Sequence, residues 1–237
     1  MACGLSSSGK IRQHSSASCA KCTVYKCRAP ESVGRYPGFC PHENHAEIRE
    51  QTVEEWSNPA ARKVFEVSDQ VLREGYGKWC RVKEVIEYSR TMGHRKLGIA
   101  FCVALRREAK VLHGMLEENG FEVTSICCMA GSPNRSDVEF DPIAGLPSTL
   151  CNPLMQAKAL NENETQLNIM LGLCVGHDVL FIKHSKAGAI PLVVKDRVLS
   201  HNPVAALSSD KSFAGGLRTR WILPYARRIN RLFRRLR

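Results

Sequence analysis

The sequence predicts an α/β protein, in which a Rossmann-like parallel sheet with flanking helices is preceded by a small loop-rich cysteine module. Four short apolar runs alternate with helical stretches between residues 96 and 207, which is typical of βαβ units. The runs are almost continuously apolar, as strands covered on both faces are. Ahead of them, four cysteines lie close together in a stretch rich in proline and glycine.

Two helices are expected before the sheet. Pro59 suits the first turn of a helix over 59–74, with Asn58 as its N-cap. Apolar residues at helical spacing then predict a helix over 82–92, which Gly93 ends.

The remaining chain alternates strands with helices in a regular order. A long connection rich in Gly, Pro, Asn and Asp (130–149) follows the second strand, and Asn152-Pro153 begins the next helix. The expected elements are strand 97–102, helix 104–118, strand 122–128, helix 153–163, strand 167–174, helix 177–185 and strand 190–196.

These elements suggest five segments. They are a disordered leader (1–18), a cysteine-rich metal module (19–45), a helical linker packed on the main domain (46–95), a Rossmann-like α/β domain (96–207) and a basic tail (208–237).

The net charge of +11 resides mostly in the tail. Lys211 and eight arginines supply nine of these charges, with no acidic residue after Asp210, which leaves +2 for residues 1–210. A helix after Pro224 would be basic and amphipathic. Nucleic acid or an anionic membrane is therefore expected as a partner only through this tail, and a disordered or artefactual end is the alternative.

The cysteines favour a reducing compartment. The first eighteen residues have no apolar core of a signal peptide, no segment approaches a membrane span, and the cysteine count of 11 is odd. We expect a cytoplasmic protein, in which clustered thiols are metal ligands or catalytic groups rather than disulfides.

The first cysteine cluster has the spacing of a metal site. Cys19, Cys22, Cys27 and Cys40 follow C-x2-C-x4-C-x12-C, with Pro41 after the last. Loops of this kind bring four thiolates to zinc or to a [4Fe-4S] cluster, and the spacing leaves both open. Four unrelated buried or free cysteines are the alternative.

A second group of cysteines ends the predicted strands. Cys102, Cys127, Cys128 and Cys174 lie there, and Cys151 precedes a helix. Because the carboxyl ends of parallel strands meet at one edge, these thiols are expected to share a site or bind a second metal. Cysteines that only fill the core are the alternative.

Cys174 is the predicted reactive thiolate. It lies in C-V-G-H-D at the start of a helix, whose free amides and dipole favour the thiolate, and His177 would be its base. Residues 195–197 and 201–203, at and after the end of the last strand, are expected at the same edge, where they would line the crevice or be polar residues of the exit loop. The Arg106-Arg107 pair would meet an anionic substrate or form a solvated helix face.

Several stretches resemble a known family. CAKCTVYKC, GIAFCVALRREAKVL, NIMLGLCVGHDVLFIKHSKA and LVVKDRVLSHNP resemble the domain of unknown function 1847 family, over about residues 19–207. The resemblance implies cysteine-mediated metal binding and no established reaction. It stops before the arginine-rich tail.

The sequence thus predicts a cytoplasmic metal- or iron–sulfur-binding protein. Redox or sulfur-transfer chemistry would take place at the strand-end cysteines, with a redox protein as partner. The alternative is a non-catalytic zinc-binding structural or scaffold protein. Neither a dinucleotide fingerprint nor a P-loop occurs in the sequence.

Overall fold

A computed structural model describes residues 17–145 and 147–208. They divide into two compact units, an N-terminal unit that ends at Asp69 and a C-terminal unit that begins at Gln70. Most of the expected leader and nearly all of the basic tail lie outside the described residues. No helix in these ranges is both long and apolar enough to span a membrane.

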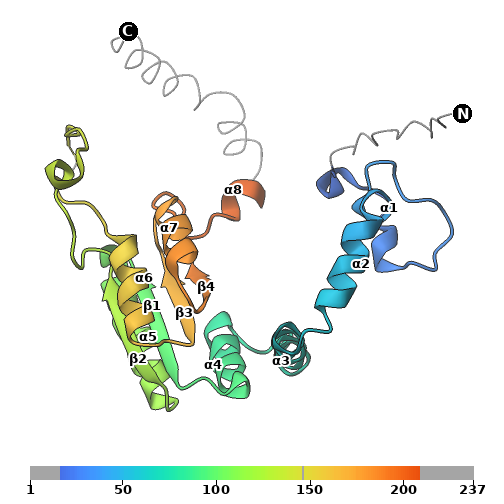
Figure 1. The fold of residues 1–237 in the computed structure, drawn as a ribbon, viewed down its shortest axis with the longest axis horizontal. Coiled ribbons are helices and arrows are strands. Elements are labelled where there is room, and N and C mark those ends of the chain that lie inside the picture. The colour runs from blue at the N-terminus through green and yellow to red at the C-terminus, as the bar shows by residue number, and fades with distance from the viewer. Residues whose placement is uncertain (1–16, 146, 209–237) are drawn as a thin grey trace, which may run out of the picture. The chain divides into compact units, whose positions relative to one another are not determined.

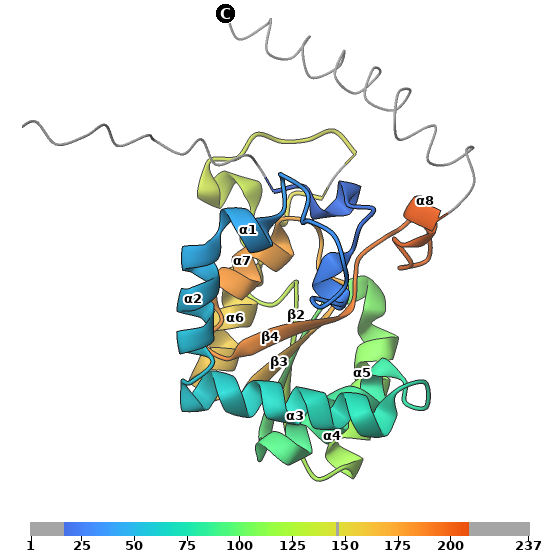
Figure 2. The ribbon, with the colours of Figure 1, turned by 90° about the vertical axis from the view of Figure 1, so that its right-hand side faces the viewer.

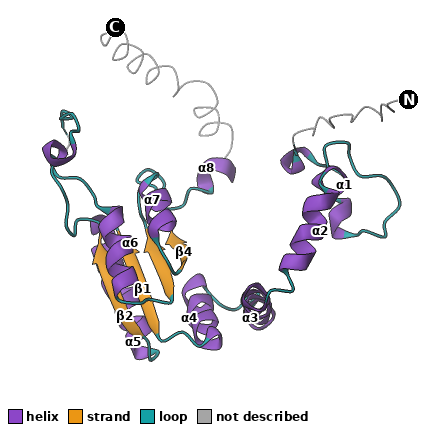
Figure 3. Ribbon diagram, in the orientation of Figure 1, coloured by secondary structure: helices purple, strands orange, loops and turns teal. Residues whose placement is uncertain are grey.

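The N-terminal unit consists of loops and helices (Figure 3). The cysteine-rich segment is mostly loop, as expected, with single turns at Cys19–Lys21 and Lys26–Arg28. Helices α1 (Pro41–Asn44), α2 (Ala46–Glu55) and α3 (Pro59–Gly75) follow, and α3 continues past Asp69. The Asn58 side chain accepts a hydrogen bond from the Ala60 amide at 2.9 Å, which is the expected N-cap.

The C-terminal unit contains the predicted α/β fold. Its four strands are all parallel, in the order β2-β1-β3-β4. The elements are α4 (Arg81–Met92), β1 (Lys96–Phe101), α5 (Arg106–Glu118), β2 (Glu122–Cys127), α6 (Pro153–Glu162), β3 (Leu167–Leu171), α7 (His177–His184), β4 (Gly188–Val193) and the short α8 (Ala205–Ser208).

Helices cover both faces of this sheet (Figures 1 and 2). One face packs against α4 and α5, through a cluster that includes Ile86 and Leu112. The other face packs against α6 and α7, through Leu160 and Phe181. The chain changes face at β1 because β2 and β3 lie on opposite sides of it, and right-handed crossovers then require opposite faces.

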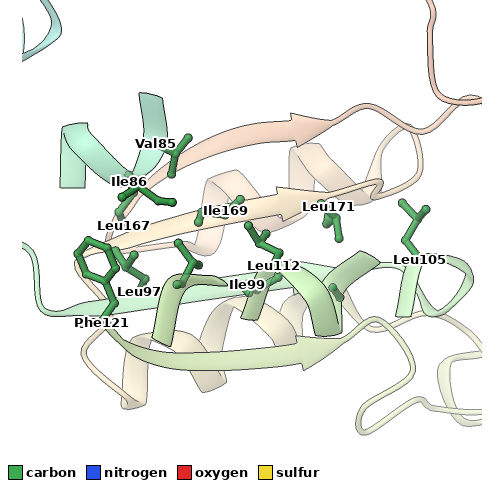
Figure 4. Close-up of a cluster of buried hydrophobic side chains, with 12 residues drawn as sticks. Val85, Ile86, Leu97, Ile99, Leu105, Leu112, Phe121, Leu167, Ile169 and Leu171 are labelled. Atoms are coloured by element: carbon green, nitrogen blue, oxygen red, sulfur yellow. The ribbon is translucent and has the colours of Figure 1, made fainter. Parts of the chain in front are cut away.

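The larger core shows why these residues form strands and an amphipathic helix (Figure 4). Leu97 and Ile99 on β1 and Ile169 on β3 are fully buried. Leu112 and Leu116 lie one turn apart on α5 and pack in the same cluster. Burial of each such side chain stabilises the fold by roughly 1.5–3 kcal/mol.

The bounds of the third and fourth strands differ most from prediction. β3 ends at Leu171, because Gly172 adopts a positive φ of 67° and turns the chain away. Cys174 therefore lies in the turn after β3 rather than on the strand. β4 starts at Gly188 and includes Pro191, which an edge strand tolerates because one side of its backbone has no partner strand.

Candidate functional site

The carboxyl ends of β1 and β3 form the switch point of the sheet. The loop after β1 leads to α5 on one face, and the loop after β3 leads to α7 on the other. Cys102 immediately follows β1, and its amide donates to the Leu171 carbonyl at 3.1 Å. Ligands of open α/β sheets bind in the crevice at this position.

Cys102 lies beside a cation. Its side chain is 6% exposed, and the Lys195 ammonium is 3.3 Å from its sulfur. Burial raises the pKa of Cys102. Hydrogen bonds from the Ala104 amide and from Lys195, the positive charge of Lys195 and the contact with Cys128 lower the pKa by more than burial raises it. The net result is a pKa below the ordinary value, so Cys102 is the thiol that favours the thiolate form.

Cys128 has the opposite tendency. It is 3% exposed, and burial raises the pKa of Cys128 well above its ordinary value. The Val103 amide, which donates to its sulfur at 3.4 Å, does not compensate, and the neighbouring thiols Cys151 and Cys102 raise the pKa further. Of these two neighbouring thiols, Cys128 therefore holds its proton more strongly than Cys102 does.

Cys151 completes a cluster of three thiols. Its sulfur lies 3.7 Å from the Cys128 sulfur and 4.0 Å from the Met129 sulfur. The side chain of the next residue, Asn152, caps α6 by accepting from the Met155 amide at 2.9 Å. The backbone amide of Asn152 donates to the Cys128 carbonyl at 2.7 Å, which holds the loop that carries Cys151 against the end of β2.

Cys174 lies beside an arginine rather than a histidine. Arg197 donates to the Cys174 sulfur at 3.2 Å, and this hydrogen bond is the main reason that the pKa of Arg197 is raised. His177, the predicted base, begins α7, and its backbone amide donates to the Cys174 carbonyl at 2.9 Å. Among the described contacts, its ring makes no hydrogen bond to the thiol.

Asp178 caps the first turn of its own helix. Its carboxylate accepts from the amides of Gly176 at 2.9 Å and Val179 at 2.8 Å. This satisfies free donors at the first turn of α7. The first turn of α7 therefore positions the Cys174 backbone, while the cation comes from the loop after β4.

Cys127 lies on the other face of the sheet from Cys128. Side chains alternate along a strand, and Ile126 packs toward α6 and α7. Cys127 therefore shares the α5 face with Ser125, whose hydroxyl contacts His113 of α5 at 3.2 Å. The structure brings Cys102, Cys128 and Cys151 together, and Cys127 does not join them.

A tight loop presents the two cations. The Asp196 carboxylate accepts from the amides of Val198 at 2.9 Å and Leu199 at 2.8 Å. The His201 ring accepts from the Asp196 amide at 3.1 Å. The loop that these contacts close carries Lys195 and Arg197, and both reach the thiols, as expected for residues after the last strand.

Gln156 holds the strand ends beneath the thiol cluster in place, and the sequence did not predict this role. It is fully buried on α6 and donates to the carbonyls of Phe101 at 3.1 Å and Ile126 at 2.7 Å. It thereby ties together the ends of β1 and β2, which carry Cys102 and Cys128. The available signal was a glutamine among the apolar residues of a predicted helix.

The four-cysteine module contains the donors that a metal site needs. Cys19 and Cys27 are exposed, and Cys22 and Cys40 are half-buried. The Cys22 sulfur accepts from the Tyr25 amide at 3.4 Å, a bond of the kind that supports thiolate ligands. In the described ranges, no three His, Cys, Asp or Glu side chains converge on a point that could hold an ion. The donor chemistry fits a thiolate-bound metal, and ligation by these four cysteines stays a prediction.

Comparisons with known proteins cover the sheet and its cysteines. A family model described as "Protein of unknown function (DUF1847)" matches residues 40–192. An uncharacterized protein of Methanocaldococcus jannaschii is 43% identical over 162 residues, which are 68% of this chain and 83% of that protein. No solved structure matches the chain. The family match includes the three-thiol cluster and Cys174, and it ends before Lys195 and Arg197.

Proposed function

The chain belongs to the DUF1847 family of proteins of unknown function, and on that premise we propose that it is a metal- or iron–sulfur-binding protein whose sheet-edge cysteines carry out thiol–disulfide redox chemistry. The observation that carries this proposal is the cluster of Cys102, Cys128 and Cys151. The pKa of Cys102 is lowered, and the pKa of its neighbour Cys128 is raised. Cys102 is therefore the thiol that ionises more readily, and disulfide exchange begins with attack by a thiolate.

The reaction follows from this difference in protonation. The Cys102 thiolate attacks one sulfur of a disulfide substrate, forms a mixed disulfide and releases the other sulfur as a thiolate. A second protein thiol then loses its proton, attacks the Cys102 sulfur and releases the second substrate thiolate. The substrate disulfide is reduced by two electrons, and the protein gains one disulfide.

Cys128 and Cys151 supply the second thiol. Their sulfurs lie 3.7 Å apart, so a small side-chain movement would allow a bond of about 2.05 Å. Cys128 is also held next to Cys102, because its amide donates to the Phe101 carbonyl at 2.8 Å and its sulfur accepts from the Val103 amide at 3.4 Å. The protein disulfide can therefore form between Cys102 and Cys128 and then pass to Cys128 and Cys151 without a large rearrangement.

The test uses the small disulfide reagent DTNB under anaerobic conditions. The reduced protein is expected to release thionitrobenzoate in a fast phase, and peptide mapping should then find a disulfide within the cluster of Cys102, Cys128 and Cys151, with no lasting adduct at Cys102; exposed cysteines such as Cys19 and Cys27 form adducts of their own. Cys102→Ser should abolish the fast phase. Cys128→Ser should leave a trapped mixed disulfide, and Cys127→Ser is the matched control that retains the reaction. A fast phase that survives Cys102→Ser would overturn the proposal.

The N-terminal module would hold the metal. Cys19, Cys22, Cys27 and Cys40 are the proposed ligands of a [4Fe-4S] cluster, which would supply single electrons, or of zinc, which would supply only structure. Anaerobic purification, metal analysis and an absorption spectrum test this. Iron with broad absorbance near about 400 nm supports a cluster, and Cys40→Ser should remove it.

A structural zinc protein is the second candidate. The burial of Cys102 and Cys128 favours it, because cysteine often fills a core as a small hydrophobe. A colourless protein with one zinc and no fast phase with DTNB would establish this reading.

We assign the proposed redox chemistry to the cytoplasm, where thiol pools keep such cysteines reduced and a redox protein can serve as partner.

A further inference from the structure

A groove runs between α5 and the edge strand β2, on the opposite face of the sheet from the thiol cluster. It has a volume of about 390 Å³ and is lined by Phe101, Arg106, Ala109, Lys110, His113, Gly114, Glu117 and Ser125. None of the cysteines discussed above lines it.

The two ends of the groove differ in charge. Arg106 and Lys110 lie one helical turn apart in the first half of α5, and the helix N-terminus adds positive potential there. Glu117 lies at the other end, about 16 Å along the helix axis from Arg106 and about 10 Å from Lys110. The groove therefore offers two cations at one end and an oxygen acceptor at the other.

One hydrogen bond and one ion-pair contact order the polar wall near the acceptor end. His113 Nε2 lies 3.3 Å from the Glu117 carboxylate, and His113 Nδ1 lies 3.2 Å from the Ser125 hydroxyl. When the neutral His113 ring carries its proton on Nε2, on the side of Glu117, Nδ1 accepts the Ser125 proton and leaves the serine oxygen as an acceptor. Ser125 and the second carboxylate oxygen of Glu117 can then accept from ligand hydroxyl groups.

The middle of the groove is open. A Cβ atom at Gly114 would meet nothing within 4 Å apart from the backbone of its own helix, so the helix presents bare backbone between its charged ends. Phe101 and Ala109 provide apolar surface beside it. A flat or ring-shaped group could lie over Gly114 while polar groups on each side hold its ends.

We propose that this groove binds a small phosphate ester that also carries hydroxyl groups, such as a sugar phosphate or a nucleoside monophosphate. A phosphate dianion matches the two positive charges of Arg106 and Lys110, and the arginine can donate two parallel hydrogen bonds to it. The hydroxyl groups of the ligand face Ser125 and Glu117. In this proposal Arg106 binds the phosphate, whereas Arg107 does not line the groove and is exposed to solvent.

Titration calorimetry with ribose 5-phosphate, AMP, adenosine and inorganic phosphate tests the proposal. At least one ester is expected to bind at least tenfold more tightly than inorganic phosphate and adenosine, because only the esters engage both ends. Arg106→Gln should weaken binding by about tenfold or more. Arg107→Gln, its matched control, should stay within about twofold of the parent.

Gly114→Leu fills the middle of the groove and should abolish binding. Leucine is a better helix former than glycine, so α5 should persist, and an unchanged fast phase with DTNB would show an intact sheet edge. Equal losses in the two arginine variants would overturn the proposal. So would no binding of either ester at about 10 mM, or binding of inorganic phosphate as tight as that of the esters, which would indicate an adventitious ion only.

Discussion

The Lys195 ammonium lies 3.3 Å from the Cys102 sulfur, although 93 positions separate the two residues in sequence. Cys102 follows β1 and Lys195 follows β4, and β3 lies between these strands. Lys195 reaches past the end of β3 at Gly172. A Cβ atom at Gly172 would make only an ordinary contact with Lys195 Cδ at 3.8 Å, but it would lie 2.3 Å from Leu105 Cδ1, in the turn that follows Cys102. The site therefore depends on a glycine that the sequence shows only as the end of a strand.

Removal of the Lys195 charge should slow the reaction of Cys102. In Lys195→Met, the pKa of Cys102 rises toward that of a buried thiol, because one hydrogen bond and one positive charge are lost. We expect the fast phase with DTNB at pH 7 to slow several-fold and to recover at higher pH. Lys183→Met, which removes an exposed lysine of α7, is the control. An unchanged pH profile in Lys195→Met would show that another group activates Cys102.

Cys128 should make the fold sensitive to alkaline pH. Its pKa is raised in the folded state, so its contribution to stability is complete below the unfolded pKa of about 8.5 and is lost as pH rises above that value. One such group lowers the free energy of unfolding by at most about 1.4 kcal/mol per pH unit. Cys102, whose pKa is lowered, has the opposite effect below pH 8.5.

Urea unfolding at pH 8 and pH 9.5 measures this effect. Cys128→Ala is less stable than the parent at pH 8, because it loses buried volume, but it should lose less stability between the two pH values. The other titrating groups are shared by the two proteins, so the effects of those that do not interact with Cys128, as Cys102 and Cys151 do, cancel. Equal losses in both would show that Cys128 ionises in the folded state as readily as in the unfolded state.

Gly172 should tolerate alanine much less well than Gly176. Both have a positive φ, which costs a side chain about 1–2 kcal/mol. At Gly172 the added carbon would also lie 2.3 Å from Leu105 Cδ1, whereas at Gly176 it meets nothing within 4 Å. We expect Gly172→Ala to cost about 2–4 kcal/mol of unfolding free energy and Gly176→Ala about 1–2 kcal/mol, as measured by urea unfolding. Equal costs would mean that Leu105 moves aside freely.

The sheet was predictable because its strands are buried on both faces. Continuous apolar runs and the caps at Asn58 and Asn152 marked the helices and strands, and the parallel topology placed the strand-end cysteines at one edge. The separation of Cys127 from Cys128 also follows from sequence, since adjacent strand residues face opposite ways. The prediction of one shared site overlooked this alternation.

The partners of the thiols were not predictable from spacing. His177 is three residues from Cys174 and was the natural candidate base, yet the cation beside the sulfur comes from Arg197. That choice depends on the turn at Gly172 and on the closed loop after β4, neither of which has a strong sequence signal. Gln156 was missed for a similar reason, because its role depends on two carbonyl groups that only the folded strands bring together.

The last prediction separates Arg197 from His177 as the group that governs Cys174. The guanidinium donates to the sulfur and stabilises negative charge on it, so Arg197→Gln should slow alkylation of Cys174 by iodoacetamide several-fold near pH 7. His177→Gln should leave the rate within about twofold, because its ring makes no hydrogen bond to the thiol among the described contacts. Peptide mass spectrometry after timed quenching gives the rate at this cysteine alone. If His177→Gln slows the reaction and Arg197→Gln does not, the histidine acts as the base that the C-V-G-H-D sequence first suggested.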